Sequence, residues 1–498
     1  MEKSRATPIP AWIATIGACI AIAAVLQLQT AKGVRGSDQY WYVQDVETLA
    51  LQGSHASNVV FPATLNWVPR RIPPPFIHNI LPLYLVAPLV PALGGYKAWV
   101  LANALGLLAT ALCGALAVRP LTGSTDAAAA AACACISLPS SAWLTSQPLA
   151  DMLVGLPVAL AVLTLARGRS LPHWFAATVF IGLAYFSRES FLLTLLLMPL
   201  AWLAASGISR RTLGGAIAIG CAALVFVPVH RALFPQNVPG CPVNLLLAAG
   251  SPGVGQAACY LPETVSPFPV GPLLHKLAGN LMTQFGIPQI RTMIFYVPFD
   301  LLAVLTLALA ARTKWRASPF FWLAAALLVT HLATIEIYQN ENRYMQPTLA
   351  VVVAGGLVWI SERFSPSRRA WLLGSWAIVL IGGVVSAVAL HRMAAEIPGA
   401  AHAFADNKAY LARVPANEGV LVSGMIPPID AEVAPRIALA AIPESVTPAF
   451  RSAMADLNVR WAFMQPDDPL LRSIPHDPDP LPRDPGAVEP ERLYRLRK

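Results

Sequence analysis

The sequence predicts an all-α polytopic membrane protein, with about eleven transmembrane helices and a small α/β domain at its C-terminus. Of its 498 residues, 56% are hydrophobic and only 12% are charged, and the mean hydropathy is +0.57. An ordinary soluble domain is about one quarter charged. Apolar runs near the roughly 20 residues that cross a bilayer recur along the chain. This composition excludes an ordinary soluble globule.

The apolar runs set the order of the predicted spans. We expect the first run to be a retained helix, because no convincing signal-peptide cleavage site follows it. The stretch 171–206 is too long for one crossing, and its polar break SRES at 187–190 predicts two short helices. The runs lie at residues 10–30, 96–118, 127–146, 149–166, 172–187, 190–206, 212–230, 292–311, 318–337, 344–361 and 370–390.

Basic residues are concentrated in alternate connections between these runs. If the N-terminus is cytoplasmic, every short loop on the inside is basic, as the positive-inside rule requires. We therefore predict an N-terminus inside and a C-terminal domain on the outer face. The residues concerned are Arg119, Arg167, Arg169, Arg210, Arg211, Arg312, Lys314, Arg316, Arg363, Arg368 and Arg369.

Three segments are predicted to lie outside the membrane. Two are loops, at 31–95 and 231–290, within a transmembrane bundle that covers 1–390, and the third is the C-terminal domain at 391–498. In that domain, GVLVSGM (419–425) and VRWAFMQ (459–465) predict buried strands, and PAFRSAMADLN (448–458) between them predicts a helix. The final Pro- and Asp-rich stretch predicts an extended, partly mobile strap.

Cysteines are placed mostly in the apolar runs, where a thiol behaves as a small hydrophobic group. Only Cys241 and Cys259 share a predicted outside loop. An oxidising outer face allows a disulfide between them, and two unpaired thiols remain the alternative.

The stretch RGSDQYWYVQDVETLALQG (35–53) sets three carboxylates among aromatic residues directly after the first apolar run. On a helix that begins near Asp38, the side chains of Asp38, Tyr42 and Asp45 share one face. Two interpretations remain open. Aromatic residues form interfacial belts and acids favour a helix N-terminus, but the same face could also line a polar site at the membrane surface.

Three short segments together resemble the GT-C glycosyltransferases, polytopic membrane enzymes that use lipid-linked sugar donors. SDQYWYVQDVETLALQG (37–53) is similar to the family's first outside loop, which carries an essential aspartate. SQPLADMLVGLPVALAVLTLARGR (146–169) looks like its second outside turn, where an acidic residue, here Asp151, heads a span. YQNENRYMQPTLAVVVAGGL (338–357) is similar to its R-Y-x-x-P signature.

The resemblance implies a hexosyl- or pentosyltransferase in a bacterial cytoplasmic membrane, with its active site facing out. It would move a sugar from a polyprenyl-phosphate lipid to an envelope glycan, lipid or protein acceptor, and nucleic acid is not expected as a partner. Asp38 would be the general base, and fixed cations would stabilise the phosphate leaving group. The expected substrate-binding residues are Tyr42, Asp45, Arg70, Arg71, Asp151, Arg188, Arg343 and Tyr344.

Metal use and two other functions stay open at this point. No cofactor is certain, and a divalent cation is an alternative, but Asp45 and Glu47 are two residues apart and point to different sides of a helix. A lipid-linked glycan flippase or transporter would concentrate ionisable residues near the membrane midplane. A polysaccharide polymerase or ligase would place its large active loop late in the chain. Here the ionisable residues gather at one rim and the acidic loop is the first one.

Overall fold

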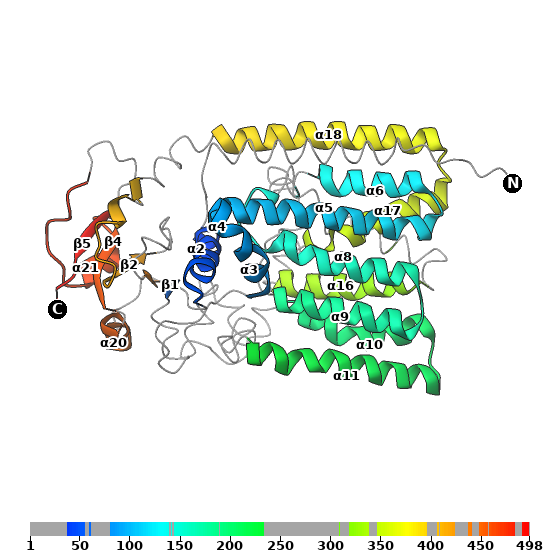
Figure 1. Cartoon of the computed structure of the whole chain (residues 1–498), viewed down its shortest axis with the longest axis horizontal. Coiled ribbons are helices and arrows are strands. Elements are labelled where there is room, and N and C mark those ends of the chain that lie inside the picture. The colour runs from blue at the N-terminus through cyan, green and yellow to red at the C-terminus, as the bar shows by residue number, and fades with distance from the viewer. Residues whose placement is uncertain are drawn as a thin grey trace.

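The computed structural model describes residues 37–54, 59–60, 80–138, 141, 144–188, 190–233, 308, 318–337, 346–395, 406–407, 409–423, 437–440, 448–456, 458–483 and 491–497. Within these residues the chain forms a bundle of long apolar helices with a small sheet beyond one end (Figure 1). The run predicted at 10–30 and nearly all of the run at 292–311 lie outside the described residues, as do Cys241 and Cys259.

The other predicted spans are helical, which confirms the all-α reading of the bundle. Among the residues that the structure describes, four helices are long and apolar enough to cross a membrane, at Gly95–Thr122, Arg210–His230, Gln346–Phe364 and Arg368–Val385. The chain is an integral membrane protein with several candidate spans. The bundle comprises α5 (Gly95–Thr122), α6 (Thr125–Ser137), α8 (Asp151–Arg167), α9 (Leu171–Ser187), α10 (Phe191–Ser206), α11 (Arg210–Leu233), α16 (Pro319–Ile337), α17 (Leu349–Phe364) and α18 (Arg368–Ala395).

Two helix ends test the sequence-based boundaries. The polar break at 187–190 is confirmed, because α9 ends at Ser187 and α10 begins at Phe191. The expected helix 127–146 was too long, since α6 ends at Ser137. Leu138, which caps α6, is extended (φ −67°, ψ 132°) and precedes Pro139, and a residue before proline disfavours the helical conformation.

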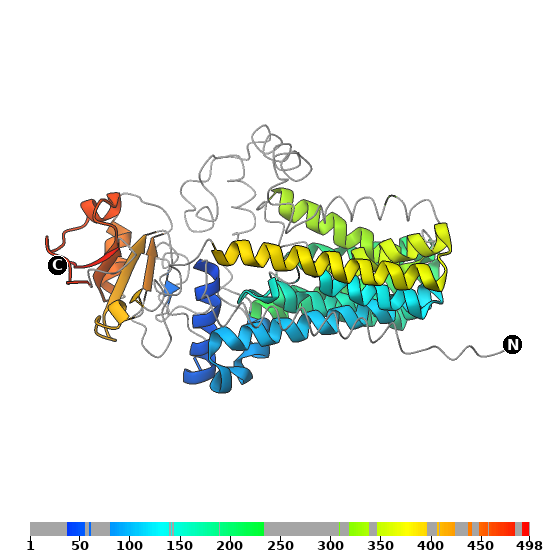
Figure 2. The same ribbon diagram turned by 90° about the horizontal axis from the view of Figure 1, so that it is seen from above.

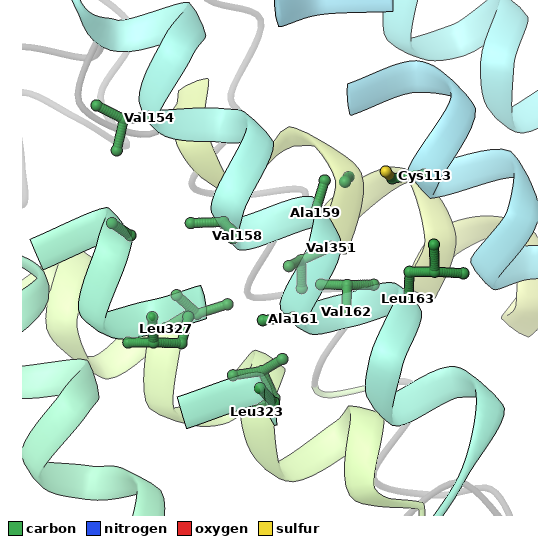
Figure 3. Packing of buried hydrophobic residues seen from close by; sticks show 14 of the residues in the cluster. Cys113, Val154, Val158, Ala159, Ala161, Val162, Leu163, Leu323, Leu327 and Val351 are labelled. Atoms are coloured by element: carbon green, nitrogen blue, oxygen red, sulfur yellow. The ribbon is translucent and has the colours of Figure 1, made fainter. Parts of the chain in front are cut away.

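The core of the bundle is built around α8 (Figure 3). Val158 and Val162 of α8 are fully buried, and Leu327 of α16 and Val351 of α17 belong to the same cluster. Small residues let the backbones approach closely, as is usual between membrane helices. A Cβ atom on Gly106 of α5 would lie 3.2 Å from the side chain of Leu153 in α8.

The connections at the two ends of the bundle differ in charge. The turns after α5, α8, α10 and α17 gather at the end away from the sheet (Figure 1). They carry Arg119, Arg167, Arg210, Arg363 and Arg368 at or beside the helix termini. This arrangement agrees with the charge asymmetry used to predict the topology, and the orientation itself remains a prediction.

Short elements cover the opposite end of the bundle. They are α2 (Ser37–Gln52), α3 (Ile80–Val86), η2 (Ala87–Leu89) and α4 (Val90–Leu93). Helix α2 lies across the ends of the long helices rather than along them (Figure 2). The stretch that begins with Asp38 therefore forms the predicted helix, at the end of the bundle that also faces the sheet.

The sheet is mixed and has the strand order β1-β3-β2-β4-β5. Its first three neighbouring pairs are parallel, and β4 and β5 are antiparallel. The predicted strand, helix and strand are confirmed as β2 (Gly419–Ser423), α20 (Pro448–Asp456) and β4 (Val459–Met464). The other strands are β1 (Val59–Val60), β3 (Ile437–Ala440) and β5 (Arg492–Arg495).

Two features of the sheet correct the sequence-based picture. Strand β1 comes from the segment 31–95, which was predicted as an outside loop, and pairs with β3, so this segment contributes to the C-terminal sheet. The expected strap is not simply extended, because it contains a helix, α21 (Pro469–Ser473), and the strand β5. Leu493 and Tyr494 in β5 are buried, and that burial offsets the low hydrophobicity of the surrounding tail.

Candidate active site

Helix α2 is attached to the bundle through the N-terminus of α5. The carboxylate of Glu47 accepts a hydrogen bond of 3.0 Å from the backbone N–H of Gly95. The residue that precedes α5, Gly94, supplies no side-chain cap, so Glu47 satisfies a donor that α5 leaves open. A negative charge at a helix N-terminus is also favoured by the helix dipole. Glu47 thus fixes α2 at this end of the bundle.

Tyr42 makes a second contact between the same two helices. The indole N–H of Trp99 in α5 donates to the backbone carbonyl of Tyr42 over 3.0 Å. Their rings meet edge to face, with centroids 5.3 Å apart. Leu49, two turns further along, is buried in the core cluster. The helix face that carries Tyr42 and Asp45 therefore turns toward the bundle.

The middle of α2 is buried although it is polar. Asp45 is fully buried, and Gln44 and Thr48 are each only 1% exposed. Buried polar groups are costly unless they are hydrogen-bonded, so such a concentration makes this helix a candidate for the site. Of the predicted carboxylates whose burial the structure describes, Asp45 is 0% exposed and Asp151 is 3% exposed.

A polar turn between α6 and α8 lies against α5. The side-chain amide of Asn103 in α5 donates to the carbonyls of Gln147 (2.7 Å) and Leu149 (3.0 Å). The amide of Gln346, just before α17, donates to the hydroxyl of Ser141 over 2.9 Å. These contacts position the turn that leads directly into Asp151.

Asp151 and Arg188 form an ion pair between the first turn of α8 and the cap of α9. The guanidinium Nη1 of Arg188 donates to Oδ1 of Asp151. The Asp151 side chain is 4% exposed and the Arg188 side chain is 23% exposed. The buried carboxylate therefore holds a partly exposed guanidinium at the end of the bundle that carries α2.

The third motif reaches the same region through Pro347. This residue lies in a 3₁₀ turn at 346–348 that precedes α17. A Cβ atom on Gly155, one turn after Asp151, would lie 3.8 Å from the Cα of Pro347. The absence of a side chain at Gly155 thus allows the turn of the R-Y-x-x-P segment to approach α8.

Several predicted site residues fall outside what the structure describes. Arg70, Arg71, Arg343 and Tyr344 lie in segments that are not described, and Asp38 is placed as a residue of α2 without a description of its side chain. Their roles stay predictions. The structure brings together the segments of the three motifs through α2, the Asp151–Arg188 pair and the turn at Pro347.

The chemistry of this end is that of carboxylates, amides and a guanidinium. Within the described ranges, no group of three or more His, Cys, Asp or Glu side chains is arranged to hold a metal ion. Glu47 points to Gly95, while Asp45 lies on a different side of α2, as expected for residues two apart. The two carboxylates therefore leave α2 in different directions, and metal use stays unassigned.

Sequence reasoning missed the contacts that assemble the site. Asn103 and Gln346 are isolated polar residues inside or beside apolar runs. Their position in those runs was the feature of the sequence that could have indicated a role in the site. Polar side chains in membrane segments usually face the bundle interior and bond across helices. That rule could have selected both residues but not their partners.

No protein-family model matches the chain, and no curated protein matches its sequence. Solved structures, however, are similar to this chain. ArnT from Cupriavidus metallidurans, bound to undecaprenyl phosphate, aligns with a TM-score of 0.61 at 13% identity, over 97% of this chain and 98% of that chain. The chain has the GT-C fold.

Two further GT-C structures are similar over most of the chain. The oligosaccharyltransferase of Archaeoglobus fulgidus, in a complex with Zn and sulfate, aligns with a TM-score of 0.52 at 15% identity, covering 91% of this chain and 68% of that one. AglB from Archaeoglobus fulgidus, with an inhibitory peptide and a dolichol-phosphate, gives a TM-score of 0.52 at 12% identity, covering 92% and 69%. At these identities the likeness establishes the GT-C fold.

Proposed function

We propose that the protein is a membrane glycosyltransferase that takes a sugar from a polyprenyl-phosphate lipid and transfers it to a cell-envelope acceptor. The observation that carries this proposal is the fold, which matches ArnT bound to undecaprenyl phosphate over 97% of the chain. The gathering of the three motif segments at one end of the bundle supports the same function. The acceptor would be an envelope glycan, lipid or protein.

The proposed reaction is displacement at the anomeric carbon. Asp38 accepts the proton of the acceptor hydroxyl while the oxygen attacks, and the sugar–phosphate bond breaks with its electron pair passing to the phosphate. Asp45, on the same face of α2, orients the acceptor or the surroundings of Asp38. Tyr42 and its neighbouring aromatic residues form the wall of the site at the membrane surface.

Arginines hold the lipid phosphate in this proposal. Arg343, with Arg188 and one of Arg70 or Arg71, offers guanidinium forks that match the phosphate oxygens as negative charge develops on the leaving group. The Asp151–Arg188 ion pair supports this role because it fixes one guanidinium at the site. Tyr344 lies beside Arg343 in sequence and completes the proposed binding set.

The site is proposed to face the outer side of a bacterial cytoplasmic membrane. The concentration of arginines at the far end of the bundle supports this orientation. The unit 391–498, joined by β1 of the first loop, then lies over the site on the outside.

The decisive experiment uses the full-length protein in lipid nanodiscs, with undecaprenyl phosphates that carry a radiolabelled hexose or pentose and with envelope fractions as the acceptor. We expect transfer of label by the parent protein. Asp38→Asn keeps the shape of the side chain but removes the base, so transfer should fall by about 10²–10⁴-fold while undecaprenyl phosphate still binds. Transfer at the parental rate would exclude Asp38 as the base. Normal glycan export in cells by an inactive Asp38→Asn protein would identify a flippase instead.

The phosphate clamp is tested by Arg343→Lys. Lysine keeps the positive charge but loses the planar fork, so turnover should drop markedly and donor binding should weaken. Initial rates and undecaprenyl-phosphate binding measured in the same nanodiscs check this result. Unchanged turnover and affinity in Arg343→Ala would remove this arginine from the site.

A further inference from the structure

Helix α2 carries two polar side chains that take no part in its hydrogen bonds to the bundle. Gln44 and Thr48 are one helical turn apart and therefore lie on the same side of α2, with Asp45 adjacent. Glu47, three residues after Gln44, flanks this side of the helix, and its carboxylate accepts from the backbone N–H of Gly95 in α5. Tyr42 packs on Trp99. Neither of these contacts uses the side chains of Gln44 and Thr48.

These two side chains are buried and lack hydrogen bonds within the described part of the chain. Neither the oxygen nor the nitrogen of the Gln44 amide has a partner there, and the same holds for the hydroxyl of Thr48. Each residue is 1% exposed, so bulk water does not replace the missing bonds. An amide and a hydroxyl in such a place oppose folding unless something polar pairs with them.

The chemistry of the pair selects a neutral ligand with several hydroxyl groups. An amide donates two hydrogen bonds and accepts others, and a hydroxyl both donates and accepts. One carboxamide can therefore bridge two neighbouring hydroxyls of a sugar ring, and Thr48 can reach a third. Neither group carries a positive charge, and Asp45 beside them repels anions. A phosphate is thus a poor match for this side of α2, and a sugar ring is a good one.

We propose that Gln44 and Thr48 form a recognition site for the ring hydroxyls of a sugar, and this inference rests on the proposed glycosyltransferase function. The same chemistry could meet the sugar of the lipid donor or a sugar of the acceptor. In either case the two residues determine which sugar binds, while Asp38 and the arginines act on the bond that is broken.

The test compares lipids with and without a sugar. Full-length parent protein, Gln44→Met and Thr48→Val are placed in nanodiscs, and dissociation constants are measured for undecaprenyl phosphate and for undecaprenyl phosphate that carries glucose, mannose or arabinose. If the donor sugar binds this site, one sugar-bearing lipid binds the parent at least tenfold tighter than the bare lipid. Gln44→Met then abolishes that difference and leaves the affinity for the bare lipid unchanged.

A second measurement covers the case in which the site binds a sugar of the acceptor. In that case saturation-transfer NMR with methyl glucoside, methyl mannoside and methyl arabinoside detects a glycoside signal in the parent. Gln44→Met and Thr48→Val remove this signal, while their affinities for the donor lipids stay parental. Gln39→Met is the matched control, because it makes the same change in α2 on another side of the helix. It should keep the parental sugar preference in both measurements.

Two results would overturn the proposal. The first is a sugar preference and glycoside signal in Gln44→Met equal to those of the parent, and the second is their complete absence in the parent. Loss of thermal stability in Gln44→Met would count against it as well, because an amide without protein partners should not stabilise the fold. Failure of undecaprenyl phosphate itself to bind the parent would instead contradict the proposed function, which keeps the two failures distinguishable.

Discussion

Asp151 occupies a position where two independent effects stabilise its negative charge. It lies in the first turn of α8, where the helix dipole favours an acid, and it pairs with the guanidinium of Arg188. Removal of one partner from a buried ion pair leaves the other charge without compensation, and that penalty exceeds the value of the pair itself. The contact between α8 and α9 is therefore sensitive to a change on either side.

We expect Asp151→Ala to lower the thermal midpoint of the detergent-solubilised protein, with a loss of up to about 3 kcal/mol, the lower end of the range for a buried pair because Arg188 is partly exposed. Asp151→Asn should cost less, since an amide still accepts a bond from the guanidinium. The double change Asp151→Ala with Arg188→Met removes both charges and should recover part of the loss. Equal midpoints for parent and Asp151→Ala would show that the pair does not contribute to stability.

The two members of this pair could be selected from the sequence, but their contact could not. Asp151 was selected by the resemblance of its segment, and Arg188 by the polar break that splits an overlong apolar stretch. They are 37 positions apart. Only the antiparallel packing of α8 and α9 brings them together, and apolar periodicity does not specify which faces of two membrane helices meet.

At the scale of elements, the Glu47–Gly95 contact joins a polar helix to the long helix α5. A Cβ atom on Gly95 would lie 2.7 Å from Cγ and Oε1 of Glu47, so the site admits glycine alone without movement of the carboxylate. The backbone N–H of Gly95 would otherwise be an unsatisfied donor at a helix start. This hydrogen bond adds to the contacts that position α2, which include the Tyr42–Trp99 pair and the buried side chains of Val46 and Leu49.

We expect Glu47→Ala to cost roughly 1 kcal/mol, as for the loss of a helix cap, and to reduce transfer activity because α2 is no longer fixed. Gly95→Ala should resemble it, since the new methyl group displaces the carboxylate. In the Glu47→Ala background the clash disappears, so Gly95→Ala should become neutral or mildly stabilising. Thermal midpoints of the parent, Glu47→Ala, Gly95→Ala and the double variant test whether the effects of the two substitutions are coupled.

Gly214→Ala in α11 is the control for this cycle, because nothing lies within 4 Å of its added Cβ position. It should leave the midpoint equal to or slightly above that of the parent, because alanine is the better helix former. Additive effects of Glu47→Ala and Gly95→Ala would contradict the proposed contact.

Elements defined by local sequence were predictable, and elements defined by distant partners were not. β2, α20 and β4 follow from short apolar runs and helical spacing. β1 has only two residues, Val59 and Val60, and exists through its pairing with β3. The end of α6 was available locally from Pro139 but was hidden by the apolar residues that continue past it.

At the scale of the whole molecule, the charged loops predict how the bundle sits in the membrane. A reporter that is active only in the cytoplasm, fused after residue 400, should remain silent, whereas the same reporter fused after Arg169 should be active. The activity of each reporter, and the presence of each fusion protein in the membrane fraction of the cells, check these two expectations. Activity of the first fusion would reverse the assignment of the outer face, and with it the proposed location of the site.

The pairing of β1 with β3 also sets an order of events during biosynthesis. Val59 and Val60 leave the ribosome early, but their hydrogen-bonding neighbours, Ile437 and Ala438, follow only after nearly all the membrane helices have been made. Domains usually fold as they emerge, and pairings between distant segments form slowly. Strand β1 must therefore wait without its final partner while the helices between it and β3 are inserted. Completion of the sheet is then a late step that can occur only in a chain in which both strands have reached the same side of the membrane.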